Sequence, residues 1–189
     1  MNVLVIPEDF RKDQYMLKPI ITAILAEIGR IAKIRVCQDP LLGGISQALK
    51  WSRINEILNR YQGMVDLFLL CVDRDGIETR KHSLNSLEEK ASEALPEGKL
   101  LLAENAWQEI EVWVLAGHDL PADWIWQELR MEPNPKERYY EPFAKMQNTF
   151  NEPGEGRKTL AQAAAGRYPR MRQLCPELSD IEKRIRDWL

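Results

Sequence analysis

Four short apolar runs constrain the fold of this chain more than any other feature of its sequence. They lie at residues 2–6, 31–37, 65–72 and 99–102, and each is rich in Val, Ile or Leu. Short runs of this composition predict β-strands. Because they are apolar throughout, instead of alternating with polar residues, they predict a parallel sheet that is covered on both faces.

Helical patterns separate the runs and then take over the chain. The expected helices cover residues 14–28, 46–61, 83–95, 104–116, 121–130, 136–149, 159–167 and 176–189. This order predicts an α/β fold of Rossmann-like type, with a mostly parallel four-stranded sheet flanked by helices and an all-helical C-terminal extension. We expect an α/β domain over residues 1–120 and an extension over residues 121–189 that packs on it as one compact unit.

The composition is that of a globular protein. The 189 residues carry 26 basic and 29 acidic side chains, a formal net charge of −3, which argues against a wholly basic nucleic-acid coat protein. The three cysteines are far apart and form no Cys-x-x-Cys pair, which disfavours a disulfide framework or a zinc site and favours a reducing cytoplasm. No apolar run approaches the roughly 20 residues that span a bilayer, so no membrane partner is expected.

Carboxylates follow two of the predicted strands. Glu8 comes just after the first run, and Asp73 and Asp75 come just after the third. In a parallel sheet the carboxyl ends of the strands meet at one edge, and residues two apart in an extended chain point the same way. These side chains are therefore expected to converge, and Mg²⁺ prefers such oxygen ligands. The pattern predicts a magnesium site, and the alternative is an Asp that caps the next helix.

Further acids lie in the helix predicted at residues 104–116. Glu111 shares a helical stripe with the large apolar side chains of Trp107 and Leu115. Its carboxylate is therefore either paired, exposed at the edge of the stripe or a ligand. Glu104, in the expected first turn, is explained as a favourable partner for the helix dipole.

The order of these motifs resembles the Toprim catalytic domain, in which a Glu follows the first strand and an Asp-x-Asp follows the third strand of a βαβαβ array. Residues 108–116, Gln-Glu-Ile-Glu-Val-Trp-Val-Leu-Ala, are similar to the Glu-x-Trp-Leu-Leu helix of the RloB and DUF4276 groups of small Toprim-like proteins. The tail at residues 156–160, 168–170 and 174–176 is also similar to the DUF4276 C-terminus. The likeness covers most of the chain in order, and its first two motifs are the chemically specific ones.

The resemblance implies a Mg²⁺-dependent (or Mn²⁺-dependent) phosphoryl-transfer fold, as in topoisomerases, primases and nucleases. In the small forms it implies a role in phage defence beside an ATPase. By position it makes Glu8 the general acid or base and makes Asp73 and Asp75 metal ligands, with Glu111 completing the cluster.

The chain departs from the Toprim pattern directly after Glu8. Many relatives have Gly at the next position, whereas this chain has Asp9, followed by Asp13. Together with Glu109, these residues are possible additional acids of the site. An extra acid could hold a second ion, or it could mean that the site has diverged.

Basic residues offer contacts for phosphates. Residues 157–172 contain five basic side chains and no acid, a local charge of +5. Such a stretch binds a nucleic-acid backbone or is a solvated helix face. Basic residues near the acids either contact a phosphate beside the metal or act as counter-charges. The expected phosphate contacts are Arg74, Arg80, Lys81, Arg157 and Lys158.

The leading hypothesis is a Toprim-like, Mg²⁺-dependent nuclease that cleaves phosphodiester bonds in DNA or RNA. The first alternative is a non-catalytic Toprim-like subunit or regulator that docks through its helical half on a partner ATPase of the AAA or ABC type. A third possibility is a carboxylate-rich α/β enzyme that acts on a small phosphorylated substrate. A homodimer is compatible with each of them.

Overall fold

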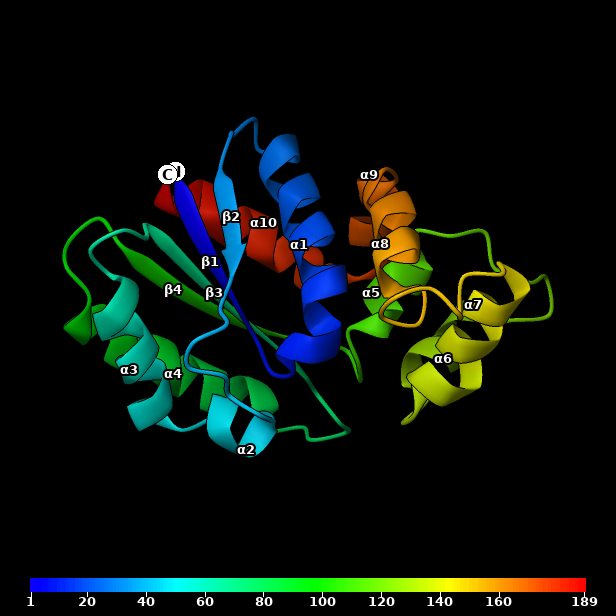
Figure 1. Ribbon diagram of the computed structural model, residues 1–189, viewed down its shortest axis with the longest axis horizontal. Helices are drawn as coiled ribbons and strands as arrows, with labels where there is room; N and C mark the ends of the chain where they lie inside the picture. The colour runs from blue at the N-terminus through cyan, green and yellow to red at the C-terminus, as the bar shows by residue number, and fades with distance from the viewer.

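Four parallel strands form one sheet in the computed structural model, which describes residues 1–189. The strands are β1 (Asn2–Pro7), β2 (Lys33–Val36), β3 (Leu67–Asp73) and β4 (Leu100–Ala106), in the order β2-β1-β3-β4 (Figure 1). Val5 of β1 lies opposite Val36 on one side and Leu69 on the other. The predicted α/β fold with a four-stranded parallel sheet is therefore confirmed, and all strands end at the same edge.

Alternate residues of the strands enter two separate apolar clusters, one on each face of the sheet. Val3 and Val5 belong to the larger cluster and Leu4 and Ile6 to the smaller one. The larger cluster is covered by α1 (Phe10–Glu27) and by helices of the C-terminal half, and the smaller by α2 (Ile45–Ala48), α3 (Trp51–Tyr61) and α4 (Arg80–Ala94). Figure 1 shows the two groups of helices on opposite sides of the sheet. Such two-sided burial explains why the strands are apolar throughout.

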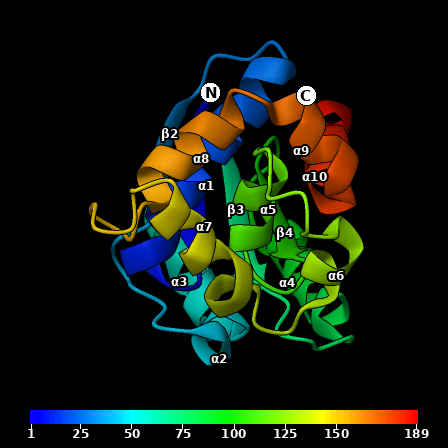
Figure 2. The same cartoon turned by 90° about the vertical axis from the view of Figure 1, so that its right-hand side faces the viewer.

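The C-terminal half consists of helices, as expected. They are α5 (Glu111–Ala116), α6 (Trp126–Met131), a π-helix η1 (Lys136–Tyr140), α7 (Glu141–Met146), α8 (Arg157–Ala165), α9 (Tyr168–Leu174) and α10 (Pro176–Trp188). Side chains of α8, α9 and α10 share one continuous apolar cluster with α1 and the sheet. Figure 2 shows α8 beside α1, and α10 on the side of the molecule where β4 lies. None of the helices combines the length and the apolar character that a membrane crossing requires.

The helix predicted over residues 104–116 is wrong in its first half. There β4 continues to Ala106, in register with the full length of β3, and α5 begins only at Glu111. The polar pair Glu104 and Asn105 hides the strand, because both side chains are buried with partners of their own. Glu104 therefore does not occupy a first helical turn. The helix predicted over residues 46–61 is likewise divided into α2 and α3.

Candidate active site

Glu8 and Asp73 lie side by side at the carboxyl edge of the sheet. Glu8 directly follows β1, and Asp73 is the last residue of the neighbouring strand β3. The backbone N–H of Asp73 donates a hydrogen bond to Oε2 of Glu8 at 3.4 Å. Parallel pairing of the two strands is thus what brings together two carboxylates that are 65 residues apart in the sequence.

Asp73 is surrounded by acids and receives little compensation. The backbone N–H of Ile110 donates to its Oδ1 at 2.9 Å, and its other carboxylate oxygen has no donor. Burial raises the pKa of Asp73 well above its ordinary value, and the nearby charges of Glu111, Asp13 and Glu8 raise it further. An ionised Asp73 is therefore a destabilised group that a cation would relieve.

The side chain of Glu8 contacts Asp73 and also borders a cavity. Burial raises its pKa, the charge of Asp75 adds to this, and hydrogen bonds from the backbone of Asp73 and Ile45 oppose it. The cavity beside Glu8 has a volume of about 460 Å³. It is lined by Glu8, Asp9, Phe10, Arg11, Leu41, Gly43 and Gly44. A water molecule or a substrate could therefore reach this carboxyl group.

The two acids that follow Glu8 have different roles. Asp9 is the N-cap of α1, where its side chain accepts a hydrogen bond from the backbone of Arg11 at 2.9 Å. Asp13 is buried and accepts one from the backbone of Asp9 at 2.9 Å. Burial raises the pKa of Asp13 to about 7, with the charges of Glu111, Asp9 and Glu8 as further causes. Asp13 therefore belongs to the acidic group, whereas Asp9 caps the helix.

The backbone at Asp75 departs from the extended conformation of β3. Its backbone is left-handed, with φ of 52°, so the rule that residues two apart in a strand point the same way does not apply here. Nη2 of the buried Arg80 lies 3.4 Å from its Oδ2. The Nε atom of Arg80 is also buried and has no hydrogen-bond partner. Arg80 is thus a counter-charge for Asp75 that keeps one donor unused.

Glu111 is paired with Arg157. Nη2 and Nε of Arg157 donate to Oε1 of Glu111 at 2.7 and 3.2 Å. Arg157 is 0% exposed, and its Nη1 bonds to the side chain of Glu155 and to the carbonyl of Gly154. The expectation that Arg157 contacts a nucleic-acid backbone is therefore wrong, because solvent does not reach this guanidinium.

Glu109 is bound to the start of η1. Its Oε2 accepts a hydrogen bond from the backbone N–H of Lys136 at 2.9 Å. Burial raises its pKa to about 7, and the charge of Glu111 adds to the shift. Glu109 therefore connects the loop before α5 to the start of η1.

Gln108 holds the loops after β3 and β4 together, a role that no pattern in the sequence predicts. Its carbonyl oxygen accepts from the backbone of Arg74 and of Asp75 at 2.8 and 3.2 Å. Its side-chain Oε1 accepts from the backbone of Gly76 at 2.8 Å. Gln108 itself has a left-handed φ of 68°. In the helix that was expected here it would have been an ordinary helical residue.

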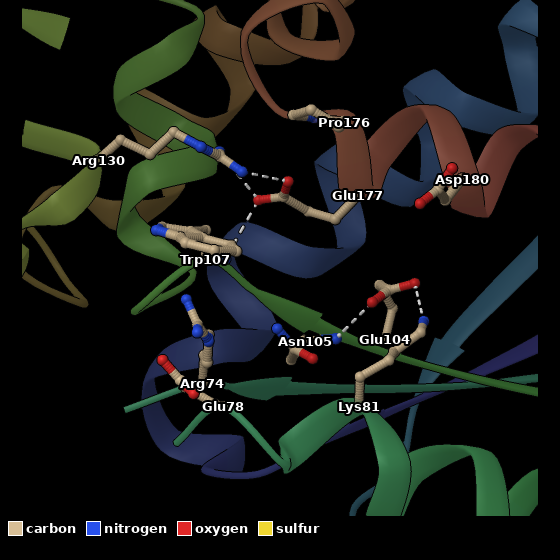
Figure 3. Close-up of a pocket in the computed structure, with 10 residues that line it drawn as sticks. All are labelled: Arg74, Glu78, Lys81, Glu104, Asn105, Trp107, Arg130, Pro176, Glu177 and Asp180. Atoms are coloured by element: carbon tan, nitrogen blue, oxygen red, sulfur yellow. Dashed lines mark hydrogen bonds and ion pairs between the residues drawn. The ribbon is translucent and has the colours of Figure 1, made fainter. Parts of the chain in front are cut away.

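A second cavity, of about 340 Å³, lies at the ends of β3 and β4 against α10 (Figure 3). The ten residues that line it are Arg74, Glu78, Lys81, Glu104, Asn105, Trp107, Arg130, Pro176, Glu177 and Asp180. The guanidinium carbon of Arg74 lies 3.8 Å from the centroid of the Trp107 ring, and that of Arg130 lies 5.3 Å from it. Lys81 is paired with Glu104, whereas Arg74 has no acidic partner. Trp107 is half-buried and forms a wall of this cavity.

The basic stretch at residues 157–172 is largely neutralised. Apart from Arg157, its arginines pair with acids from other segments: Arg167 and Arg170 with Asp119, and Arg172 with acids that include Glu182. Lys158 is exposed and forms no ion pair. The stretch therefore offers much less free positive charge than its sequence suggests.

No group of three or more His, Cys, Asp or Glu side chains is arranged to hold a metal ion. No protein-family model, no curated protein and no solved structure matches the chain. Function must therefore be inferred from the side chains at the carboxyl edge, where Glu8 and Asp73 are directly linked.

Proposed function

We propose that the chain is a metal-dependent nuclease of the Toprim type, which uses Mg²⁺ or Mn²⁺ to hydrolyse phosphodiester bonds in DNA or RNA. The observation that carries this proposal is the contact of Glu8 with Asp73 at the ends of adjacent strands, in a group of acids with raised pKa values. Perturbed carboxylates that meet at this edge of an α/β sheet are typical of functional sites. The likeness to small Toprim-like proteins extends the proposal to phage defence.

The donor set suits a magnesium ion that is only partly ligated by protein. Mg²⁺ usually binds one or two carboxylates and completes its shell with water and phosphate oxygens. Asp73 has a carboxylate oxygen without a hydrogen-bond donor, whereas Asp75 and Glu111 are held by arginines. Asp73 would therefore hold the ion. A bound ion would stabilise the negative charge that develops on the scissile phosphate.

Glu8 is the proposed proton carrier. Its carboxyl group borders the cavity of about 460 Å³ and also touches the backbone of Asp73. Burial raises its pKa and so brings the group closer to the range in which a carboxyl group exchanges protons near neutral pH. Glu8 would accept a proton from the attacking water or donate one to the leaving oxygen.

Arg74 is proposed to orient the substrate. It follows Asp73 directly, lies over the Trp107 ring and has no acidic partner. Arg80 is buried and remains the counter-charge of Asp75. A planar guanidinium suits the oxygens of a phosphate group. Arg74 would therefore contact a backbone phosphate of the nucleic acid, next to the phosphodiester bond that is cleaved.

The thiols do not provide an alternative nucleophile. Cys37, Cys71 and Cys175 are buried and unpaired, and burial raises the pKa of the Cys37 thiol to about 11. Thiols in this state are inert.

A nuclease assay tests the proposal. Labelled single-stranded DNA, duplex DNA and RNA would be incubated with purified protein and Mn²⁺ or Mg²⁺. We expect cleavage that EDTA abolishes and that Glu8→Gln and Asp73→Asn each reduce by about 10² to 10⁴-fold. Glu78→Gln is the matched control, because Glu78 is an exposed acid at the same edge without an ion pair. Equal activity in all four proteins would identify a contaminating nuclease and contradict the proposal.

A non-catalytic subunit that docks on an ATPase is the second candidate. It is favoured by large apolar side chains exposed in the helical half, namely Ile125, Met131 and Met146, which are 52%, 61% and 56% exposed. Exposed apolar side chains mark a protein interface where they form one contiguous patch, which this candidate requires of them. This candidate predicts little heat on calorimetric titration with Mn²⁺ and no change after Asp73→Ala.

A further inference from the structure

The cavity of about 340 Å³ at the ends of β3 and β4 adjoins the proposed active site. Its lining includes Arg74, the residue directly after Asp73, and reaches the first turns of α10 (Figure 3). Ligands of parallel α/β sheets bind outside the carboxyl ends of the strands, which is where this cavity lies. Its volume is at the lower end of the range for ligand pockets, so it suits one compact group.

One wall of the cavity is flat. The guanidinium of Arg74 lies over the Trp107 ring, with 3.8 Å between its carbon atom and the ring centroid, and both side chains are half-buried. This contact holds the planar guanidinium in place without an acidic partner. Aromatic rings and arginine planes are the groups on which unpaired nucleobases stack in proteins. The wall therefore suits a planar ring.

Asn105 contributes an unused acceptor to the same cavity. It is 8% exposed and lies in β4 between Arg74 and Glu104 (Figure 3). Its Nδ2 donates to the carbonyl of Ala106 at 3.3 Å, whereas its Oδ1 accepts no hydrogen bond. A buried amide oxygen without a donor costs free energy. A ligand with an N–H group in the cavity would remove this cost.

The charges of the lining disfavour a phosphate in the interior of the cavity. Four acidic and three basic side chains line it. Two of the basic groups are paired with acids of the same lining, which leaves Arg74 for a phosphate on the side of Asp73. Asp180 is exposed, forms no ion pair and adds a second free acceptor. The interior therefore suits a neutral group that donates hydrogen bonds.

On this basis, and resting on the proposed function, we infer that the cavity receives one unpaired nucleobase of a single-stranded nucleic acid, next to the bond that is cleaved. The base packs against Arg74 and Trp107, and its exocyclic amino group donates to Oδ1 of Asn105. Adenine and cytosine carry such an amino group, whereas thymine does not. A base in a duplex is stacked and paired, so it cannot enter unless it is flipped out. The substrate is therefore a single strand with an amino-bearing base at this position.

Binding without metal tests this inference separately from the nuclease activity. The full chain would be titrated in EDTA against labelled oligonucleotides of equal length, namely oligo(dA), oligo(dT) and an abasic strand, and followed by fluorescence anisotropy. We expect oligo(dA) to bind about tenfold more tightly than oligo(dT) and at least about tenfold more tightly than the abasic strand. Equal affinity for oligo(dA) and the abasic strand would overturn the inference.

The two proposals fail in different measurements. Cleavage that EDTA abolishes, without any preference among these strands, keeps the proposed function and overturns the base site. The expected preference, without cleavage of any strand in Mn²⁺, overturns the proposed function and leaves a cavity that binds a nucleobase.

Variants test whether the preference arises in this cavity. Asn105→Ala should lower the affinity for oligo(dA) about tenfold and leave the affinity for the abasic strand and for a duplex unchanged. Asn151→Ala is the matched control, because Asn151 is an exposed Asn outside this lining. If Asn105→Ala does not fold, Asp180→Ala replaces an exposed residue of the lining and should reduce the preference for oligo(dA) over oligo(dT). An unchanged preference in the folded variants would overturn the inference.

Discussion

Two carboxylates near the ends of β3 and β4, the buried Glu177 and the half-buried Asp73, have opposite surroundings. Glu177, in the first turn of α10, accepts hydrogen bonds from the backbone of Trp107 at 3.1 Å, from Nε1 of Trp113 at 2.9 Å and from both Nη atoms of Arg130 at 3.2 and 2.7 Å. Asp73 accepts a single hydrogen bond from a backbone N–H. One carboxylate is fully matched by donors, and the other is surrounded by further acids.

This difference is the one expected between a structural acid and the acid that the proposed function makes a metal ligand. Glu177 joins the β4–α5 loop to α6 and α10, so its charge stabilises the fold. Asp73, Glu8 and Asp13 gain little from their own neighbours, and the rest of the fold holds them in place. Unfavourable arrangements of this kind persist where a ligand or a reaction makes use of them.

Removing the structural acid should have the largest effect. Glu177→Leu leaves Arg130 and the Trp113 N–H without their partner in a buried setting. We expect the free energy of unfolding to fall by about 3 to 5 kcal/mol, as for other broken buried ion pairs. Urea denaturation at pH 7 measures this.

Glu177→Gln is the matched control, because an amide oxygen can still accept hydrogen bonds from both tryptophan N–H groups. It should lose distinctly less stability than Glu177→Leu. Equal losses in the two variants would show that the hydrogen bonds to Glu177 contribute little.

Removing an unmatched acid should have the opposite sign. The Asp13 carboxyl ionises near its ordinary pKa of 3.8 in the unfolded chain and near pH 7 in the folded protein. The folded state therefore loses stability as the pH rises through that interval, and Asp13→Asn removes the loss. We expect the variant to be more stable than the wild type by on the order of 3 kcal/mol at pH 8, and by less than half of that at pH 5.

Asp9→Asn is the control for this pH dependence. Asn also serves as an N-cap, and the Asp9 charge is only one of the causes of the raised Asp13 pKa. The variant should therefore gain much less stability at pH 8 than Asp13→Asn does. A destabilised Asp13→Asn protein at pH 8 would contradict the description of Asp13 as an unmatched acid.

A divalent ion should stabilise the folded protein by binding at Asp73, and it should have no effect on the interactions of Glu177. At ten to a hundred times its Kd, Mg²⁺ should add about 1 to 3 kcal/mol to the free energy of unfolding. The gain should be larger at pH 8 than at pH 6, because protons compete for Asp73, whose pKa is raised. Thermal unfolding with MgCl₂ or EDTA measures it. Asp73→Asn should abolish the gain, and persistence of the full gain in that variant would exclude Asp73 as the ligand.

The sequence predicts those features of the site that depend on neighbouring residues or on parallel pairing. Apolar runs mark the strands, and strands that end at one edge bring Glu8 to Asp73. The ion pair of Glu111 with Arg157 joins two helices of the C-terminal half. Its residues are 46 positions apart in the sequence, so no local pattern predicts it. The role of Gln108 does not follow from the sequence for a different reason: β4 extends further than its apolar run, so the pattern predicts a helix where the loop lies.

The smallest effect is expected from the arginines of the neutralised basic stretch. Arg167 and Arg170 share one carboxylate, that of Asp119, at distances of 2.7 to 3.1 Å, so one of their two charges is offset. The double variant Arg167→Ala/Arg170→Ala should change the affinity for single-stranded DNA and its salt dependence less than a single substitution at the carboxyl edge does. Arg74→Ala should instead weaken binding and reduce the slope of log K against log salt by about 0.7, the value for one lost phosphate contact on a single strand. Fluorescence anisotropy in buffer that contains Ca²⁺, recorded across a range of salt concentrations, measures the affinity and the slope for each variant. A reduced slope in the double variant and an unchanged slope in Arg74→Ala would move the nucleic-acid contact from the carboxyl edge to α8 and α9.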